Sequence, residues 1–215
     1  MENLRRLFAN NRTLVEQITG DDPDFFRRRA GKQEPHFLFI GCADSRVPIE
    51  TLTGVAPGEM FVHRNIANQA LPADLNLLSV LQYAVEVLDV KHVIVCGHHQ
   101  CGGVKAAMDE PTHGLVDVWL SGIRECILRH RDELTAYTNE QDRFDRLVEL
   151  NVLRQVYNLS RTPIVQNAWR RGRRPLIHGI VYDLKDGLLR PLLLEVDGAD
   201  KVRTLLEGNR RGVGD

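Results

Sequence analysis

The sequence predicts a single α/β domain whose mainly parallel sheet is covered by helices on both faces. Apolar runs at 36–41 and 92–96 are rich in branched and aromatic residues and are bounded by glycine, as buried strands of parallel sheets commonly are. Segments with helical spacing alternate with such runs along the chain. The 215 residues, 43% of them hydrophobic, suffice for one well-filled domain without a linker. We therefore expect one domain over 1–215.

The first 30 residues predict a helical arm. Apolar and charged residues alternate there, which suggests two short amphipathic helices, the second of them opened by Asp22-Pro23-Asp24. Such an arm, residues 1–30, cannot bury its apolar face alone. We expect it to pack on the body of the protein or on a second subunit.

Turn residues separate the expected strands. A turn at 55–59 contains Pro57 and Gly58 and precedes a short apolar run. Asp186-Gly187 forms a tight turn before the last run, in which Pro191 lacks a ladder donor and therefore suits an antiparallel edge strand. The strands are expected at 36–41, 60–63, 92–96, 164–165, 177–182 and 188–194.

Helical spacing and capping residues mark the helices of the body. Asp74 is a suitable N-cap, and the apolar residues after it repeat at helical spacing as far as Leu88. Gly102-Gly103 opens the next helix. Two longer amphipathic helices are expected at 115–131 and 141–159.

Two cysteines and a histidine follow two of the predicted strands. Cys42 closes the first run, and His98 and Cys101 come directly after the run that ends at Cys96-Gly97. Neighbouring parallel strands end at one edge of the sheet, where active sites form, so these side chains can meet around one metal ion. A Cys₂His set suits zinc, and three ligands leave a position for water, as in catalytic sites. From the residues alone, His99 is an alternative to His98.

Composition excludes several classes of partner and location. A formal net charge of −1 gives no electrostatic case for nucleic acid or an anionic membrane. No segment approaches about 18 apolar residues, and the N-terminus lacks the apolar stretch of a secretory signal, so we expect a cytoplasmic protein. Four cysteines at irregular spacing suit metal binding or the core more than disulfides; Cys96 and Cys126 are expected in the core.

A carboxylate and a guanidinium accompany the first cysteine. In Cys42-Ala43-Asp44-Ser45-Arg46 the Arg46 fork can hold Asp44 ionised and fixed in orientation. Together with His98-x-x-Cys101-Gly102-Gly103, this pattern resembles the β-class carbonic anhydrases of bacterial type. The resemblance covers nearly the whole chain, and its other segments are 57–68, 74–84, 149–152 and 178–188.

The resemblance implies a zinc enzyme. Cys42, His98 and Cys101 would bind one Zn²⁺ per subunit, and Asp44 with Arg46 would act beside the fourth coordination position. The implied activity is the reversible hydration of CO₂ to bicarbonate and a proton by zinc-bound hydroxide. The family also implies a homodimer or a homotetramer, in which the N-terminal arm wraps the partner.

Further positions match functional positions of the family. Gln33 corresponds to a position near the CO₂ site of the neighbouring subunit. Gly102 would let substrate or bicarbonate approach the backbone at a helix N-terminus, although glycine is also common there for other reasons. In one subgroup a tryptophan, an arginine and a tyrosine bind bicarbonate at a non-catalytic pocket and stabilise a state in which the aspartate ligates zinc. Arg64 and Tyr182 match this pocket, whereas Phe39 replaces the tryptophan.

Two other functions compete with this interpretation. Hydrolysis of CS₂ or COS on the same fold would need an altered access route and no new ligands. A non-catalytic, zinc-stabilised interaction protein would need neither an open coordination position nor the Asp44–Arg46 dyad, so the dyad favours an enzyme. The H-x-E and P-C-x-x-C signatures of zinc deaminases are missing.

Overall fold

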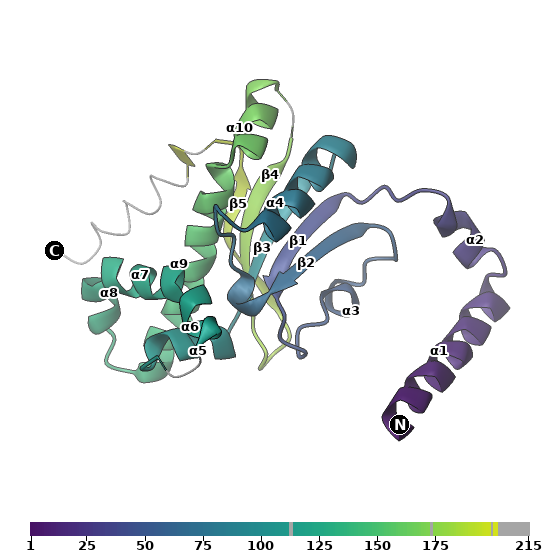
Figure 1. Cartoon of the computed structure of the whole chain (residues 1–215), viewed down its shortest axis with the longest axis horizontal. Coiled ribbons are helices and arrows are strands. Elements are labelled where there is room, and N and C mark those ends of the chain that lie inside the picture. The colour runs from purple at the N-terminus through teal and green to yellow at the C-terminus, as the bar shows by residue number, and fades with distance from the viewer. Residues whose placement is uncertain (112–113, 173, 199, 202–215) are drawn as a thin grey trace. The chain divides into compact units, whose positions relative to one another are not determined.

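A five-stranded sheet forms the core of the unit that begins at Pro35 (Figure 1). The computed structural model describes residues 1–111, 114–172, 174–198 and 200–201, so the last part of the predicted 1–215 domain, 202–215, lies outside the described residues. The strands are β1 (Phe37–Cys42), β2 (Met60–Asn65), β3 (His92–His98), β4 (Leu176–Tyr182) and β5 (Leu189–Val196).

The sheet has the predicted parallel arrangement with one antiparallel edge. Its strands lie in the order β2-β1-β3-β4-β5; the first four are parallel, and β5 is antiparallel to β4. Pro191 lies on the edge strand opposite Ile180, as expected for a residue without a backbone donor. In the register of β1 and β3, Phe37 pairs with His92 and Gly41 with Cys96, so both strands end at the same edge.

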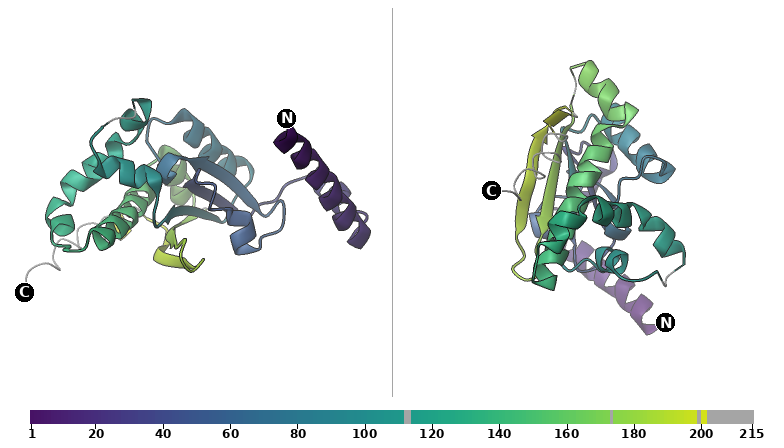
Figure 2. Two further views of the ribbon diagram at one scale, coloured as in Figure 1. Left: turned by 90° about the horizontal axis from the view of Figure 1, so that it is seen from below. Right: turned by 90° about the vertical axis from the view of Figure 1, so that its left-hand side faces the viewer.

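Most helices of this unit pack on one face of the sheet (Figure 2). The longest, α9 (Glu140–Ser160), contacts β3, β4 and β5. It approaches β3 so closely that a Cβ at Gly97 would lie 2.6 Å from Val152 Cγ2. The same core includes residues of α4 (Leu75–Gln82), the π-helical turn η2 (Tyr83–Val87), α5 (Gly102–Met108), α7 (Ser121–Arg129), α8 (Arg131–Thr135) and α10 (Pro163–Arg170).

The other face carries much less helix than expected. There Phe39, Cys96 and Tyr182 pack with Ile49 of α3 (Ile49–Thr53), a short helix that the sequence analysis did not predict. Within the described part of the 35–215 unit, helices therefore lie on both faces, as predicted, but nearly all of them lie on one face.

Two predicted elements of the body are wrong. The helix expected at 115–131 is divided into α6 (Leu115–Trp119) and α7, and α8 begins at the last residue of this range. Arg124 bonds the carbonyl and the carboxylate of Asp117, and His130 leaves the helical region at φ −109° and ψ 24°. The strand expected at 164–165 lies inside α10, because the Thr162 side chain caps Val165 N–H and proline occupies the first turn.

Residues 1–34 form a unit of their own. As predicted, they contain two helices, but the first, α1 (Glu2–Asp21), has 20 residues and is not short; α2 (Phe25–Ala30) follows Asp22-Pro23-Asp24. Neither helix has a buried residue, and the exposed apolar side chains include Leu4, Leu7, Phe8, Leu14 and Phe26. That this arm packs on a partner subunit stays a prediction. No described helix is both long and apolar enough to cross a membrane.

His92 and His178 contact each other near the end of the sheet opposite to Cys42 and His98. The Glu195 backbone N–H donates to His178 Nδ1 at 3.2 Å, which leaves the proton of the neutral ring on Nε2, 3.0 Å from His92 Nδ1. Burial lowers the pKa of both histidines; Arg174 and exposed His36 lower that of His92 further, and Glu195 opposes the shift in each. The fold therefore favours the neutral form of both rings.

We expect this pair to weaken the fold at mildly acid pH. Because the pKa of His178 in the folded protein lies below its ordinary value of 6.5, the unfolded chain binds more protons as the pH falls below 6.5. The urea midpoint should thus fall more for the parent than for His178→Gln between about pH 7.5 and pH 5.5. If the urea midpoint falls equally in the parent and in His178→Gln, this histidine pair does not contribute to the pH dependence of stability.

Candidate metal centre

Three soft or borderline ligands meet at the carboxyl end of β1 and β3. Cys42 is the last residue of β1, His98 is the last of β3, and Cys101 immediately precedes α5. All three are buried, and their ligand atoms lie within 4.8 Å of one another. The predicted convergence of two strand ends is confirmed.

The geometry fits a zinc ion. Two sulfurs at about 2.3 Å from a tetrahedral zinc lie about 3.8 Å apart, and the Sγ atoms of Cys42 and Cys101 are 3.8 Å apart. His98 Nδ1 lies 3.0 Å from the His99 carbonyl oxygen and donates to it, so the lone pair is on Nε2. That Nε2 is buried and has no hydrogen-bond partner among the described residues.

His99 is oriented away from this role. Its Nδ1 lies 3.4 Å from Asp183 Oδ2, and it is not among the grouped ligand atoms. The ambiguity that the sequence left between the two adjacent histidines is thus resolved by geometry in favour of His98.

The surroundings stabilise thiolate in the pair of cysteines. A hydrogen bond from the Cys101 thiol lowers the pKa of Cys42 to about 4 against the effect of burial, and the backbone N–H groups of Asp44 and Ala67 act in the same direction as Cys101. The same interaction raises the pKa of Cys101, whereas the backbone N–H groups of Val104 and Gly103 lower it. Metal binding requires both thiolates, and these backbone donors are already directed at the sulfurs.

Asp44 and Arg46 form the predicted dyad beside the ligands. Arg46 Nε lies 3.0 Å from Asp44 Oδ1 and its Nη2 lies 2.7 Å from Oδ2, so the contact is bidentate. These bonds lower the pKa of Asp44 to about 2. Asp44 Oδ2 is 3.7 Å from His98 Nε2, which places an ionised carboxylate next to the ligand cluster. Arg46 is fixed in turn by the Gln100 carbonyl at 3.2 Å.

Several positioning residues were missed or assigned another role from the sequence. Arg64 donates to the carbonyls of Cys42 at 2.9 Å and Asp44 at 2.6 Å, and so holds the loop that carries both. Asn151 of α9 donates to the Ala67 carbonyl at 3.0 Å, which supports the segment whose N–H is directed at Cys42. A buried asparagine on the apolar side of a helix was the available signal.

The remaining predicted residues are only partly brought together. Phe39 and Tyr182 lie in one buried cluster, while Arg64 is exposed on the neighbouring strand β2. Gly102 begins α5 with open space where a Cβ would be, and Gln33 is exposed in the N-terminal unit. Cys96 and Cys126 are buried in the core, as predicted.

Known proteins are similar to this chain in sequence and in fold. The carbonic anhydrase family model matches residues 37–189. A carbonic anhydrase of Emericella nidulans is 44% identical over 208 residues, which cover 95% of this chain and 91% of that protein. A carbonic anhydrase of Pseudomonas aeruginosa is 37% identical over 184 residues, with coverage of 82% and 80%.

The fold agrees with these sequence matches. A crystal structure of a tetrameric β-carbonic anhydrase from the ascomycete Sordaria macrospora superposes with a TM-score of 0.85 at 36% identity and covers 89% of this chain and 98% of its own. The motifs, the Cys₂His cluster and these matches agree, and the chain belongs to the β-class carbonic anhydrase family.

Proposed function

We propose that this protein catalyses the reversible hydration of CO₂ to bicarbonate and a proton, with one Zn²⁺ per chain on Cys42, His98 and Cys101. The observation that carries this function is the meeting of two thiols, an unpartnered imidazole nitrogen and a fixed carboxylate at one end of the sheet. When bound, zinc lowers the pKa of water at its fourth position toward about 7 and so supplies a nucleophile near neutral pH.

Asp44 orients the nucleophile in this proposal. Its carboxylate accepts a hydrogen bond from the attacking hydroxyl group and thereby turns an oxygen lone pair toward CO₂. Arg46 holds both carboxylate oxygens, which keeps Asp44 ionised and prevents it from rotating. The His99 carbonyl fixes the His98 tautomer, and Arg64 holds the backbone on both sides of Ala43.

We also propose that the chain assembles as a homodimer or a dimer of dimers. The exposed apolar residues of α1 and α2 and the similarity to a tetrameric relative support this assembly. In it, Gln33 lies near the CO₂ site of the partner, and the Gly102 backbone is open to bicarbonate.

The ligand assignment predicts which substitutions remove zinc. Cys42→Ser, His98→Ala and Cys101→Ser should each lose zinc and activity together, because two protein donors hold the ion poorly. His99→Ala and Cys126→Ser, which alter an adjacent imidazole and a buried thiol outside the cluster, should retain it. Metal analysis of the purified variants measures this. Full zinc content in His98→Ala with loss in His99→Ala would reassign the ligand.

The role of Asp44 predicts a variant that keeps its metal but not its turnover. Asp44→Asn should bind zinc normally and lose about a hundredfold or more of its CO₂ hydration rate, because an amide NH₂ can donate where the carboxylate must accept. Asp186→Asn removes another arginine-paired carboxylate, on the surface, and should leave the rate unchanged. Stopped-flow measurement of CO₂ hydration distinguishes them; near-parental turnover by Asp44→Asn would exclude the proposed role.

Phe39 predicts weak regulation by bicarbonate. A phenyl ring has no N–H donor, and Arg64 already donates two bonds to carbonyls. One hydrogen bond to an anion changes affinity about tenfold to hundredfold, so Phe39→Trp should tighten inhibition by bicarbonate at mildly acid pH by about that factor. Because Phe39 is buried against Gly41, thermal melting must first show that the variant folds. An unchanged inhibition constant in a folded variant would make Phe39 a core residue only.

A further inference from the structure

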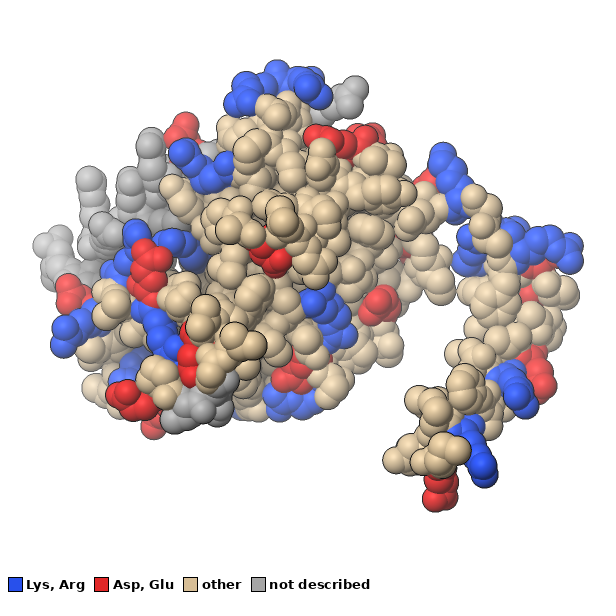
Figure 3. All heavy atoms as spheres, in the orientation of Figure 1, with Lys and Arg blue, Asp and Glu red and all other residues tan. Residues whose placement is uncertain are grey.

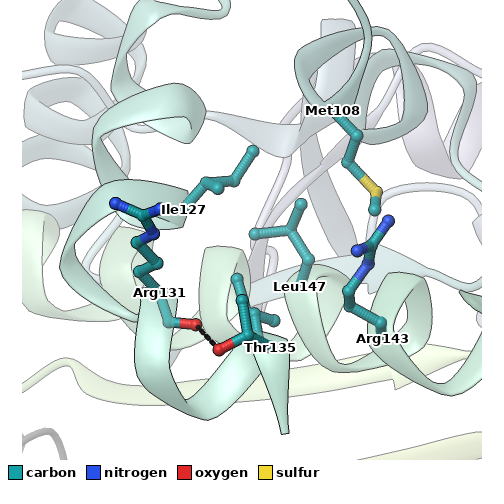
Figure 4. A pocket seen from close by; sticks show the side chains of 7 residues that line it. Met108, Ile127, Arg131, Thr135, Arg143 and Leu147 are labelled. Carbon is teal, nitrogen blue, oxygen red and sulfur yellow. Dashed lines mark hydrogen bonds between the residues drawn. The ribbon is translucent and has the colours of Figure 1, made fainter. Parts of the chain in front are cut away.

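A cavity lies among α5, α7, α8 and α9 (Figure 4). Its volume is about 170 Å³, and its apolar lining consists of Met108, Ile127, Leu134 and Leu147. Met108 is the last residue of α5, whereas the metal ligand Cys101 precedes the first residue of that helix. The cavity therefore lies at the opposite end of α5 from the metal centre and shares no lining residue with it.

Two guanidinium groups border this cavity. Arg131 and Arg143 belong to its lining, which contains no Asp or Glu, and Figure 4 shows them on opposite sides of Ile127 and Leu147. Within the described residues neither side chain forms an ion pair or a hydrogen bond, and Arg143 Nε is buried without a partner. Arg131 is exposed and Arg143 is half-buried. Because a buried N–H donor without a partner is costly, a ligand that accepts a hydrogen bond from Arg143 Nε is favoured there.

The other arginines of α7, α8 and α9 form ion pairs. Acidic and basic side chains are interspersed over the surrounding helices (Figure 3). The neighbouring arginines are paired: Arg124 with Asp117, Arg129 and Arg154 with Glu125, and Arg146 with Glu133 and Glu149. Glu125, Glu133 and Glu149 thus pair with other arginines, and Glu140 pairs with Lys105.

We propose that this cavity binds a small organic carboxylate with an apolar chain. The head group pairs with the Arg143 fork, which matches a carboxylate, and Arg131 adds positive potential from the other side. The chain occupies the apolar lining. A cavity of about 150 Å³ accommodates benzene, so a chain of about six carbons fits the volume of about 170 Å³ found here.

The methionines provide a local measurement of binding. The chain contains three, of which Met108 lines the cavity, Met60 begins β2 and Met1 is exposed. In the zinc-loaded protein labelled with [¹³C-methyl]methionine, hexanoate should shift the Met108 signal saturably and leave the other two in place. Formate, which has the charge without the chain, should not shift Met108 even where it binds the metal.

The head group is tested with a matched ligand and matched variants. Hexan-1-ol, with the same chain and no charge, should bind at least about tenfold more weakly than hexanoate, as should hexanoate to Arg143→Gln. Arg129→Gln, on the exposed surface of α7, should bind hexanoate as the parent does. The hexanol comparison uses the parent protein and does not depend on the folding of a variant. No saturable Met108 shift with hexanoate, or equal affinity for hexanol, would overturn the proposal.

Discussion

The parallel pairing of β1 with β3 is the constraint on which the metal centre depends. Because the register sets Gly41 against Cys96, Cys42 and His98 finish their strands at one edge of the sheet, and Cys101 follows after two residues. A slip of one residue would turn every side chain of a strand to the opposite face. The residues of β1 and β3 that point alternately to the two faces therefore fix the positions of the ligands as well as the register of the sheet.

Around this edge, backbone groups supply most of the support for the site. The His99 carbonyl fixes one ligand's tautomer, and N–H groups of Ala67 and Gly103 are directed at the two sulfurs. Such second-layer contacts orient ligands and tune the metal. Arg64 and Asn151 then hold that backbone from a strand and a helix far apart in sequence, so the site is prepared by the fold before any ion enters.

The sequence predicted the metal ligands more accurately than it predicted the helices. Apolar runs next to Cys42 and His98 predicted the strands, because strand periodicity is a local signal. Their common edge followed from the parallel topology of open α/β sheets, in which sites form at the carboxyl ends of the strands. The prediction of a strand at 164–165 is wrong because these two branched residues directly follow Thr162-Pro163, which starts a helix. The break at His130 has no local signal of comparable strength. Asn151 and the Ala67 carbonyl lie 84 residues apart, and only the tertiary fold pairs them.

The central claim is that two thiolates and one imidazole hold zinc and leave a fourth position open to a light atom. X-ray absorption at the zinc edge of the purified protein tests this most directly. The structure predicts two sulfur neighbours at about 2.3 Å and two nitrogen or oxygen neighbours at about 2.0–2.2 Å. A shell of three or four sulfurs, or one without sulfur, would contradict it.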